Sequence, residues 1–371
     1  MSVTLKNYTG KKFYNGTALR EIGAPWNCVL SERSDGKSLW WLKECVIDYF
    51  KENKMFAYVR RFDEDIKPKN VNRYFEDENF LDWLKKGTGF DGITCVQDAL
   101  YLCNLGETGK TVKGPKIGYS FALNIAQKRY KSLHYDGVYN ILFEEFITDG
   151  AGSSAGVVGG YIFNEFQVFN HLISTICRNK DFRVIMLGNT IGRDCPYLKE
   201  MGINLFSTKP GQIYQNNLLQ ENGNKILCAF DYVEPKEKTS LFFGKAEKTI
   251  VKGAWDVNEV PHLFFRLEDA ELIYTCVFVS EELRNAYKIR IIFYDDNKYM
   301  YVYPLQYEDV SYQHYDVFTD TPDFERKRFI HPEKRRHERL RLLWKAGRVL
   351  YSDNLCGTEF RRAMKKYNPF I

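Results

Sequence analysis

The sequence predicts an α/β protein in which a mostly parallel sheet lies between two layers of helices and a smaller α+β domain follows. Residues 139–146 and 183–189 are compact apolar runs bounded by polar or glycine residues, a pattern typical of strands buried on both faces of a parallel sheet. Residues 164–179, between these runs, have the apolar spacing of a crossover helix. After about Leu241 the alternation ends and closely spaced strand patterns take over. Two domains are therefore expected.

Composition and length agree with a folded protein. The chain has 371 residues, 44% of them hydrophobic, which is enough to bury a sizeable core, and no serine, glutamine or proline tract interrupts the pattern. The N-terminal residues lack the apolar segment of a signal peptide, and no stretch of the sequence is apolar over the length that spans a bilayer. We therefore expect a cytoplasmic protein that is not inserted in a membrane. Because the nine cysteines form no CxxC pair, we expect them to be reduced and buried.

The first domain begins with a strand, a loop and a helix. An apolar run at residues 26–30 predicts the strand. The helix is predicted at 38–53, where apolar side chains recur every three or four residues. The further elements expected before the strands and helix already described are a strand at 55–62, a short helix at 70–86 and hairpin strands between 94 and 123.

The second domain is expected to consist of strands joined by tight turns and followed by basic helices. Asp295 and Asp296, with the two residues after them, have the composition of a hairpin turn. The predicted strands are 261–268, 272–280, 287–296 and 298–306. A charged stretch at 234–253 separates the two domains, which are placed at 1–240 and 261–371 with a linker at 241–260.

Charge is distributed unevenly along the chain. The whole chain carries a net charge of +5, yet from Phe324 to Ile371 fourteen lysines and arginines face five acids, which gives +9. The remainder is therefore at −4. A basic tail on a mildly acidic body is the distribution expected of a protein that contacts phosphate backbones or another polyanion.

Residues 31–38, SERSDGKS, match the phosphate-binding loop pattern except at the first position, where Ser31 replaces glycine. In such a loop, backbone N–H groups surround the phosphates of a nucleotide, a lysine reaches the β and γ oxygens, and a hydroxyl binds Mg²⁺. Lys37 and Ser38 supply the last two groups, and Gly36 permits the tight turn. The strand predicted before this loop and the helix after it provide the required context.

A second segment, NLGETGKT at 104–111, has a similar ending with Gly109, Lys110 and Thr111. The residues after it include Pro115 and two glycines, which do not continue a helix. No helix N-terminus would then face a phosphate. We therefore expect a hairpin turn here and not a second phosphate site.

Two adjacent acids end the strand predicted at 139–146. In nucleotide hydrolases the first acid at such a strand end holds Mg²⁺ through water, and the second orients and deprotonates the attacking water. Glu144 and Glu145 are expected in these roles. Asn189 ends the neighbouring strand, where its amide can hydrogen-bond both the γ-phosphate and the attacking water. Each of these residues alone also fits a solvated turn, but their order along the chain favours a site.

This order of elements resembles the large-subunit terminases and packaging ATPases of tailed phages, in particular the DNA encapsidation ATPases of small short-tailed phages with protein-primed genomes. The resemblance spans most of residues 13–205, and the last third of the chain matches only in its general pattern. Ser31 in place of glycine and Glu144 in place of the commoner aspartate are departures. The residues that carry the resemblance are Phe13, Tyr14, Asn15, Arg33, Gly36, Lys37, Ser38, Tyr58, Val59, Arg60, Arg61, Asn72, Phe75, Phe143, Glu144, Glu145, Phe146, Tyr161, Asn164, Glu165, Arg178, Asn179 and Asn189.

The resemblance implies an ASCE-type P-loop domain that hydrolyses ATP with Mg²⁺ and drives double-stranded viral DNA into a preformed capsid. It also implies a homo-oligomeric ring, a pentamer by the family's pattern, docked at the capsid vertex in the host cytoplasm. The capsid portal protein would be a partner, and a structural packaging RNA a further one. Ser38 and Glu144 would hold Mg²⁺. The nucleotide would be bound by Ser31, Arg33, Ser34, Asp35, Gly36, Lys37 and Ser38, together with Tyr14 and Asn15.

A ring further implies that a neighbouring subunit supplies a cation to the γ-phosphate, which stabilises the transition state and couples one subunit's chemistry to the next. Arg178 and Lys131 match basic residues of the family that flank the strand with the two acids, and Arg178 is expected first. Arg33 could instead act within its own subunit. An ordinary solvated surface cation is the alternative for each of the three.

By the same resemblance, the second domain has an RNase H-like fold. A nuclease of this kind needs two or three carboxylates around its metal ions, and the predicted strands carry none in their middle, so we expect a vestigial domain. One alternative function is a terminase with an active nuclease that depends on Asp295 or Asp296. Another is an NTPase switch that does not move DNA. The basic C-terminal segments are expected to contact DNA, the portal or RNA.

Overall fold

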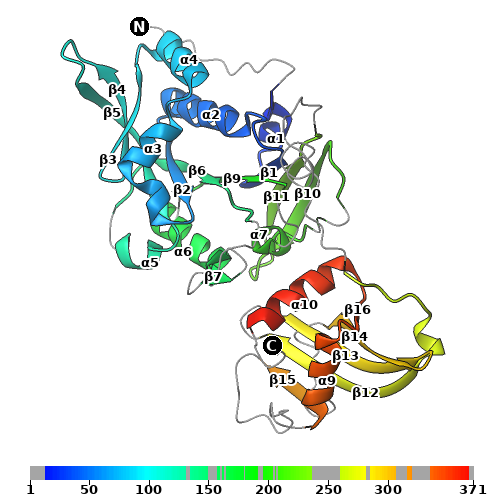
Figure 1. Ribbon diagram of the computed structural model, residues 1–371. Coiled ribbons are helices and arrows are strands. Elements are labelled where there is room, and N and C mark those ends of the chain that lie inside the picture. The colour runs from blue at the N-terminus through cyan, green and yellow to red at the C-terminus, as the bar shows by residue number, and fades with distance from the viewer. Residues whose placement is uncertain are drawn as a thin grey trace, which may run out of the picture. The chain divides into compact units, whose positions relative to one another are not determined.

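The chain forms two compact units, whose main boundary lies between Asp256 and Val257. Each unit contains a sheet of its own (Figure 1). The computed structural model describes residues 13–130, 134–148, 157–158, 161–162, 164–178, 180–190, 195–203, 205, 208–235, 260–280, 285–305, 316–319 and 335–366.

Among the described residues, the sheet of the first unit has nine strands in the order β10-β11-β1-β9-β6-β2-β5-β4-β3 (Figure 1). Neighbours from β11 to β5 run parallel, and antiparallel strands extend the sheet at both edges. The strands are β1 (Trp26–Ser31), β2 (Met55–Arg60), β3 (Gly92–Val96), β4 (Ala99–Leu105), β5 (Thr111–Ala122), β6 (Val138–Glu144), β9 (Arg183–Asn189), β10 (Gln212–Leu219) and β11 (Lys225–Tyr232). This parallel centre confirms the predicted α/β class.

Helices cover both faces of this sheet and complete the predicted three layers. Helices α1 to α4 lie in one core with the strands, and α6 and α7 in the other (Figure 1). The helices are α1 (Thr17–Glu21), α2 (Lys37–Glu52), α3 (Pro68–Tyr74), α4 (Glu78–Thr88), the short α5 (Ala126–Arg129), α6 (Glu165–Cys177) and α7 (Pro196–Glu200). A separate two-stranded ribbon pairs β7 (Val157–Val158) with β8 (Tyr161–Ile162).

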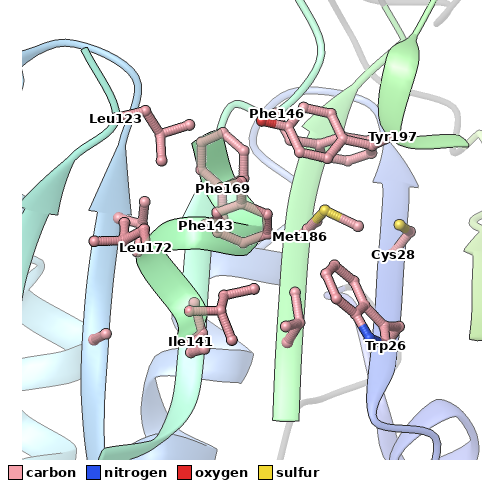
Figure 2. Packing of buried hydrophobic residues seen from close by; sticks show 14 of the residues in the cluster. Trp26, Cys28, Leu123, Ile141, Phe143, Phe146, Phe169, Leu172, Met186 and Tyr197 are labelled. Atoms are coloured by element: carbon pink, nitrogen blue, oxygen red, sulfur yellow. The ribbon is translucent and has the colours of Figure 1, made fainter. Parts of the chain in front are cut away.

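Each central strand supplies side chains to both cores, because successive side chains of a strand point to opposite faces. In β1, Trp26 and Cys28 belong to the core with α6 and α7, whereas Val29 belongs to the other. Figure 2 shows the α6 and α7 core, in which the Phe143 ring lies 5.5 Å from that of Tyr197. Packing on both faces fixes the carboxyl ends of the parallel strands, where the polar candidate residues lie.

The helix predicted at 70–86 is two helices. Helix α3 ends at Tyr74 and α4 begins at Glu78, after the Asp77 side chain accepts a hydrogen bond from the Phe80 N–H at 3.0 Å. This is an ordinary N-cap, and it starts a new helix with a new direction. The strand predicted at 139–146 also ends earlier, at Glu144, because Glu145 leaves the strand with a left-handed backbone (φ +57°).

The segment at 104–111 is a hairpin turn, as the sequence predicts. It joins β4 to β5, and the Gly106 N–H donates to the Lys110 carbonyl at 2.9 Å across the turn. Gly109 takes the left-handed conformation (φ +72°) that such turns favour. Since a strand and not a helix follows Lys110, this turn has no phosphate-binding context.

In the part of the second unit that the structure describes, a five-stranded sheet has the order β15-β12-β13-β14-β16, and α9 and α10 pack on one face. Its elements are the short turn η3 (Leu267–Asp269), β12 (Glu271–Ser280), β13 (Asn285–Tyr294), β14 (Asn297–Leu305), β15 (Asp316–Thr319), α9 (Arg335–Lys345), β16 (Val349–Tyr351) and α10 (Asn354–Lys366). The strands predicted at 272–280, 287–296 and 298–306 are confirmed, and Asp295 and Asp296 form their left-handed hairpin turn.

The strand predicted at 261–268 is wrong. Within this segment only His262 pairs with another strand, through one isolated bridge to Tyr351. The chain then forms the short 3-10 helix η3. The apolar residues of this segment pack by their side chains instead, since the Phe265 ring stacks on Tyr294 with centroids 3.8 Å apart. No helix in the described parts of the chain has the length and apolarity to cross a membrane. Eight of the nine cysteines are buried and Cys103 is half-buried.

Candidate nucleotide-binding site

The phosphate-loop pattern lies between the end of β1 and the start of α2. Gly36 precedes the helix with φ +84°, a conformation that a residue with a Cβ adopts only with strain. Ser34 is also left-handed (φ +63°). Because α2 is sixteen residues long, its N-terminus presents backbone N–H groups and the positive end of the helix dipole to this loop. The position suits the phosphates of a nucleotide.

Lys37, the first residue of α2, is buried, and its ammonium reaches the end of β9. The Lys37 Nζ donates to Asn189 Oδ1 at 2.7 Å and lies 3.4 Å from the Glu32 carbonyl oxygen. β1 and β9 are parallel neighbours with Ser31 opposite Asn189, so residues 152 positions apart in the sequence meet at one edge of the sheet. The structure thus brings the predicted lysine and the predicted amide into contact.

Glu144 ends β6 and its carboxyl group is buried beside the loop. The Tyr74 hydroxyl donates to Glu144 Oε1 at 2.5 Å. Burial raises the pKa of Glu144, and hydrogen bonds from Tyr74 and Ser38 offset part of that rise. The Glu144 carboxyl group and the Ser38 hydroxyl together offer oxygen ligands of the kind that suits Mg²⁺.

The donor set also agrees with how Mg²⁺ is held in phosphoryl-transfer sites. The ion uses one or two protein ligands together with substrate phosphates and water, and does not require an all-protein cage. Among the residues that the structure describes, no group of three His, Cys, Asp or Glu side chains could form such a cage. Ser38 and Glu144 therefore fit the ion without further protein ligands.

Glu145 differs from Glu144 in nearly every respect. It follows the strand, and its side chain is 58% exposed, so that water reaches its carboxylate. The Arg60 Nη2 donates to Glu145 Oε2 at 2.8 Å, and Arg60 also lies 3.5 Å from Asp65. Two adjacent acids thus have distinct surroundings, one buried at the loop and one open to water.

Sequence reasoning gave no role to two residues that hold this edge in place. Arg61 follows β2, is buried, and donates to the backbone carbonyls of Glu145 and Phe146. Glu165, the first residue of α6, accepts from Arg61 at 2.9 Å. Both belong to the residues that carry the family resemblance. The sequence does not reveal these contacts, because the partners are far apart along the chain. Arg61 and Glu165, for example, are separated by 104 positions.

The remaining residues predicted to bind nucleotide lie around the loop. Ser31 is buried at the end of β1, and the Asp35 carbonyl accepts from the Tyr14 N–H at 2.8 Å. The Tyr14 ring packs edge-on against Trp40, 6.0 Å away. Asn15 is exposed and accepts from the Thr17 N–H and hydroxyl, a local turn at the start of α1. Arg33 and Ser34 are exposed on the loop.

Arg178 lies at the far edge of the sheet from these residues. It follows α6 and precedes β9, whereas Glu145 and Asn189 stand at the carboxyl ends of β6 and β9. A seven-residue strand spans roughly 20 Å. Arg178 therefore lies near the amino end of β9, at the other end of this strand from Lys37 and Asn189. Lys131 lies outside the described residues.

The Tyr14 hydroxyl donates to Asp231 Oδ2 at 3.0 Å, and this partly buried pair gives a testable pH dependence. Burial raises the pKa of Asp231 to about 6 from 3.8, and the Tyr14 hydrogen bond offsets part of that rise. The folded protein then binds the proton more tightly than the unfolded chain, so stability should fall as pH rises from about 4 to above 6. At pH 8, Asp231→Asn should raise the unfolding free energy by about 3 kcal/mol or less.

The measurement is the thermal midpoint of wild type and Asp231→Asn between pH 4 and 8. The two curves should approach each other toward pH 4, where Asp231 is protonated in the folded protein and the unfolded carboxyl group is close to its own pKa. A variant less stable than wild type at pH 8 would show that the carboxylate makes a favourable interaction there.

A protein-family model described as Podovirus DNA encapsidation protein (Gp16) matches residues 10–256. The DNA packaging protein of Bacillus phage B103 is 27% identical over 220 residues, which are 58% of this chain and 58% of that relative. The chain thus spans less than two thirds of this curated relative.

Two solved structures share the fold. The Phi-28 gp11 DNA packaging motor has a TM-score of 0.60 and 18% identity, covering 97% of this chain and 99% of that one. The bacteriophage Phi-29 viral genome packaging motor assembly has a TM-score of 0.60 and 19% identity, covering 96% and 100%. The resemblance stated from the motifs is confirmed by the family match, which covers well over half of the sequence. The chain belongs to the podovirus DNA encapsidation protein (Gp16) family.

Proposed function

We propose that this protein is the ATP-hydrolysing subunit of a ring-shaped motor that moves double-stranded DNA into a capsid. One observation carries the proposal beyond family membership. A phosphate loop, a buried acid, an exposed acid and an amide meet at one edge of three neighbouring strands, with Lys37 bonded to Asn189 at 2.7 Å. Elements from distant parts of the chain thus bring together the types of residue with which nucleotide hydrolases bind phosphates and activate water.

The loop and α2 would bind the triphosphate of ATP. Gly36 and the N-terminus of α2 would offer backbone N–H groups to the phosphates, and Lys37 would contact the β and γ oxygens. Ser38 and Glu144 would hold Mg²⁺, which when bound neutralises charge on the phosphates. Tyr74 donates to Glu144 Oε1 and would hold that carboxyl group in place beside the ion.

Glu145 would act as the general base. Its carboxylate is exposed to water and lies one residue beyond the Mg²⁺ acid, so it can accept a proton from a water that attacks the γ-phosphate. Asn189 would orient the same water or the γ-phosphate, since its amide stands beside Lys37. Contacts to the reacting phosphate contribute most when they strengthen in the transition state.

Removing the Asn189 amide tests this position. We expect Asn189→Ala to lower kcat for ATP hydrolysis by roughly 10²-fold, the usual loss when one transition-state hydrogen bond is deleted. Asn189→Asp should be at least as impaired, because it places a negative charge near the γ-phosphate. Steady-state phosphate release gives both values. If Asn189→Ala keeps wild-type kcat, the amide is only a partner of Lys37.

A neighbouring subunit would supply the final cation. Arg178 stands at the sheet edge away from its own Lys37, which supports action across a subunit boundary. Such a cation stabilises the charge of the transition state by several kcal/mol and makes one subunit's turnover depend on the next. Arg33, exposed on the loop itself, is the candidate within the same subunit. Lys131 is a second candidate from the neighbour.

Mixing two inactive variants distinguishes these possibilities. An Arg178→Ala subunit keeps Lys37, and a Lys37→Ala subunit keeps Arg178. If Arg178 acts from the neighbour, a mixture should regain ATP hydrolysis although each pure variant has lost it, because some boundaries then hold both residues. Recovery should peak near equal amounts. If both variants assemble yet no mixing ratio restores turnover, Arg178 does not act in this way.

The second unit would bind the motor's partners. The exposed side chains of α9 and of the turn after it include Arg339, Lys345 and Arg348, which can neutralise phosphates of DNA or of a structural RNA, or contact the portal at the capsid vertex. Asp295 and Asp296 sit in an exposed hairpin turn, which supports a domain without cleavage.

The decisive experiment for the motor is ATP hydrolysis by the full chain with and without double-stranded DNA, followed by DNA uptake into procapsids. Turnover stimulated by DNA is the expected result. Hydrolysis indifferent to DNA would favour an NTPase switch. Mn²⁺-dependent nicking of DNA that is lost in Asp295→Ala or Asp296→Ala would favour a terminase with an active nuclease.

A further inference from the structure

Arg61 is a buried arginine that uses its guanidinium to hold the backbone beside Glu145. Its Nη1 donates to the Glu145 carbonyl at 3.0 Å and its Nη2 to the Phe146 carbonyl at 2.9 Å. The guanidinium also lies over the Phe143 and Tyr161 rings, at 5.9 and 5.1 Å. The planar fork of arginine is therefore fixed by partners on several sides.

Glu165 holds this arginine from α6. Its Oε2 accepts from Arg61 Nε at 2.9 Å and from the Ile162 N–H at 2.9 Å. Its Oε1 accepts from the Tyr197 hydroxyl at 2.8 Å. The Glu165 side chain is fully buried, and its position at the start of α6 favours a negative charge. Three elements, β2, α6 and α7, thus converge on one ion pair.

Stability alone does not account for such a pair. Moving two charges out of water is unfavourable, and well-packed apolar residues of similar volume often serve a fold equally well or better. The feature that apolar residues cannot reproduce is hydrogen bonding to two particular carbonyl groups. Those groups belong to Glu145 itself and to Phe146, the two residues that directly follow Glu144 at the end of β6.

The backbone at Glu145 requires support. Its φ of +57° lies in the left-handed region, which is unfavourable for a residue with a side chain and persists where surrounding contacts enforce it. Phe146 then packs against Gly188, where an added Cβ would lie 2.7 Å from the ring. Figure 2 shows Phe146 beside Tyr197 at the end of this core. The position of Phe146 therefore links the end of β6 to Gly188, the neighbour of Asn189.

We propose that Arg61, held by Glu165 and Tyr197, is a positioning residue that sets the backbone of Glu145 and thereby the direction of its carboxylate toward the attacking water. The inference rests on the proposed role of Glu145 as general base. Adjacent arginines divide the work: Arg60 contacts the Glu145 carboxylate, and Arg61 contacts its main chain. Misplacement of a reacting group by about 1 Å can lower a rate by roughly 10²-fold.

Arg61→Lys tests the proposal, because lysine keeps the charge but cannot reproduce the fork to both carbonyls. We expect kcat for ATP hydrolysis to fall at least about 10-fold. The KM for ATP and the Kd for a fluorescent ATP analogue should stay within about twofold, because Arg61 does not contact the phosphate loop. Tyr197→Phe, which removes one hydroxyl and keeps the ion pair, should lower kcat by a smaller factor at unchanged KM.

Arg183→Lys is the matched control. Arg183 is also largely buried, donates to Asn140 at 2.9 Å and to Asp48 at 2.5 Å, and lies over the Trp41 and Tyr139 rings, but it starts β9 at the opposite edge of the sheet. It should lower the thermal midpoint without changing kcat more than about twofold. An equal loss of kcat in Arg61→Lys and Arg183→Lys would overturn the proposal, as would full activity in Arg61→Lys.

A double variant separates this inference from the proposed function. If Arg61 acts through Glu145, adding Arg61→Lys to Glu145→Gln should not lower the residual turnover further. A further loss equal to that in the wild-type background would show that Arg61 acts elsewhere. If Glu145→Gln alone keeps full turnover, the general base is misassigned and the proposed function fails first. Should Arg61→Lys not fold, Tyr197→Phe carries the test, and its unchanged kcat would overturn the proposal.

Discussion

Replacing Lys37 with alanine should remove ATP hydrolysis, both with and without DNA, by roughly 10²-fold to 10³-fold in kcat. The Lys37 ammonium group donates to Asn189, and in the proposed site it would lie where charge develops on the γ-phosphate during transfer. Its loss would remove both a cation from the phosphates and the N–H group that donates a hydrogen bond to Asn189. Steady-state phosphate release by the purified full chain measures the effect.

The chain contains its own control for this substitution. Lys110 also follows a glycine and precedes a hydroxyl residue, but it is exposed in the turn between β4 and β5. Lys110→Ala should therefore leave kcat and KM unchanged. If turnover survives in Lys37→Ala and is lost in Lys110→Ala, the phosphate site lies at the hairpin and the assignment of the loop is wrong.

The parts of the fold that could be predicted are those with a local signal. Strongly apolar runs predicted β1, β6 and β9, and regular apolar spacing predicted α2 and α6. β10 had no such signal, because polar side chains interrupt it and it pairs antiparallel with β11 at the sheet edge. β11 does contain an apolar run, residues 226–230, but it was not among the predicted strands. The break between α3 and α4 depends on a single cap by Asp77, which a continuous helical pattern conceals.

The same distinction holds for the site. Gly36, Lys37 and Ser38 are adjacent, and their pattern is readable because the loop's chemistry requires adjacent residues. The contacts that surround the acids join α3 and the end of β2 to the end of β6, and α6 to the end of β2, across 70 to 104 positions in the sequence. Such pairing depends on the order of strands in the sheet, which the sequence alone does not specify. The sequence therefore shows Arg61 as a residue of the matching motif, but its role follows only from its contacts in the folded protein.

Glu145→Gln should lower kcat for ATP hydrolysis by roughly 10²-fold to 10⁴-fold, the range for loss of a general base. Glutamine keeps the size of the side chain and can still accept from Arg60, but it cannot take a proton from water. Nucleotide affinity should therefore remain within about twofold of wild type, as measured with a fluorescent ATP analogue. Folding should be little changed, since the side chain is 58% exposed.

Glu144→Gln is the matched control, since it makes the same change from carboxylate to amide at the neighbouring acid. Its main effect should be on Mg²⁺, with more of the ion required for half-maximal turnover, because Glu144 is buried beside Ser38. The two variants thus separate binding of the ion from activation of water. If Glu145→Gln shifts the Mg²⁺ requirement and Glu144→Gln does not, the two roles are exchanged. If Glu145→Gln retains full turnover, neither the base nor the motor mechanism built on it can stand, and a nucleotide switch would explain the loop better.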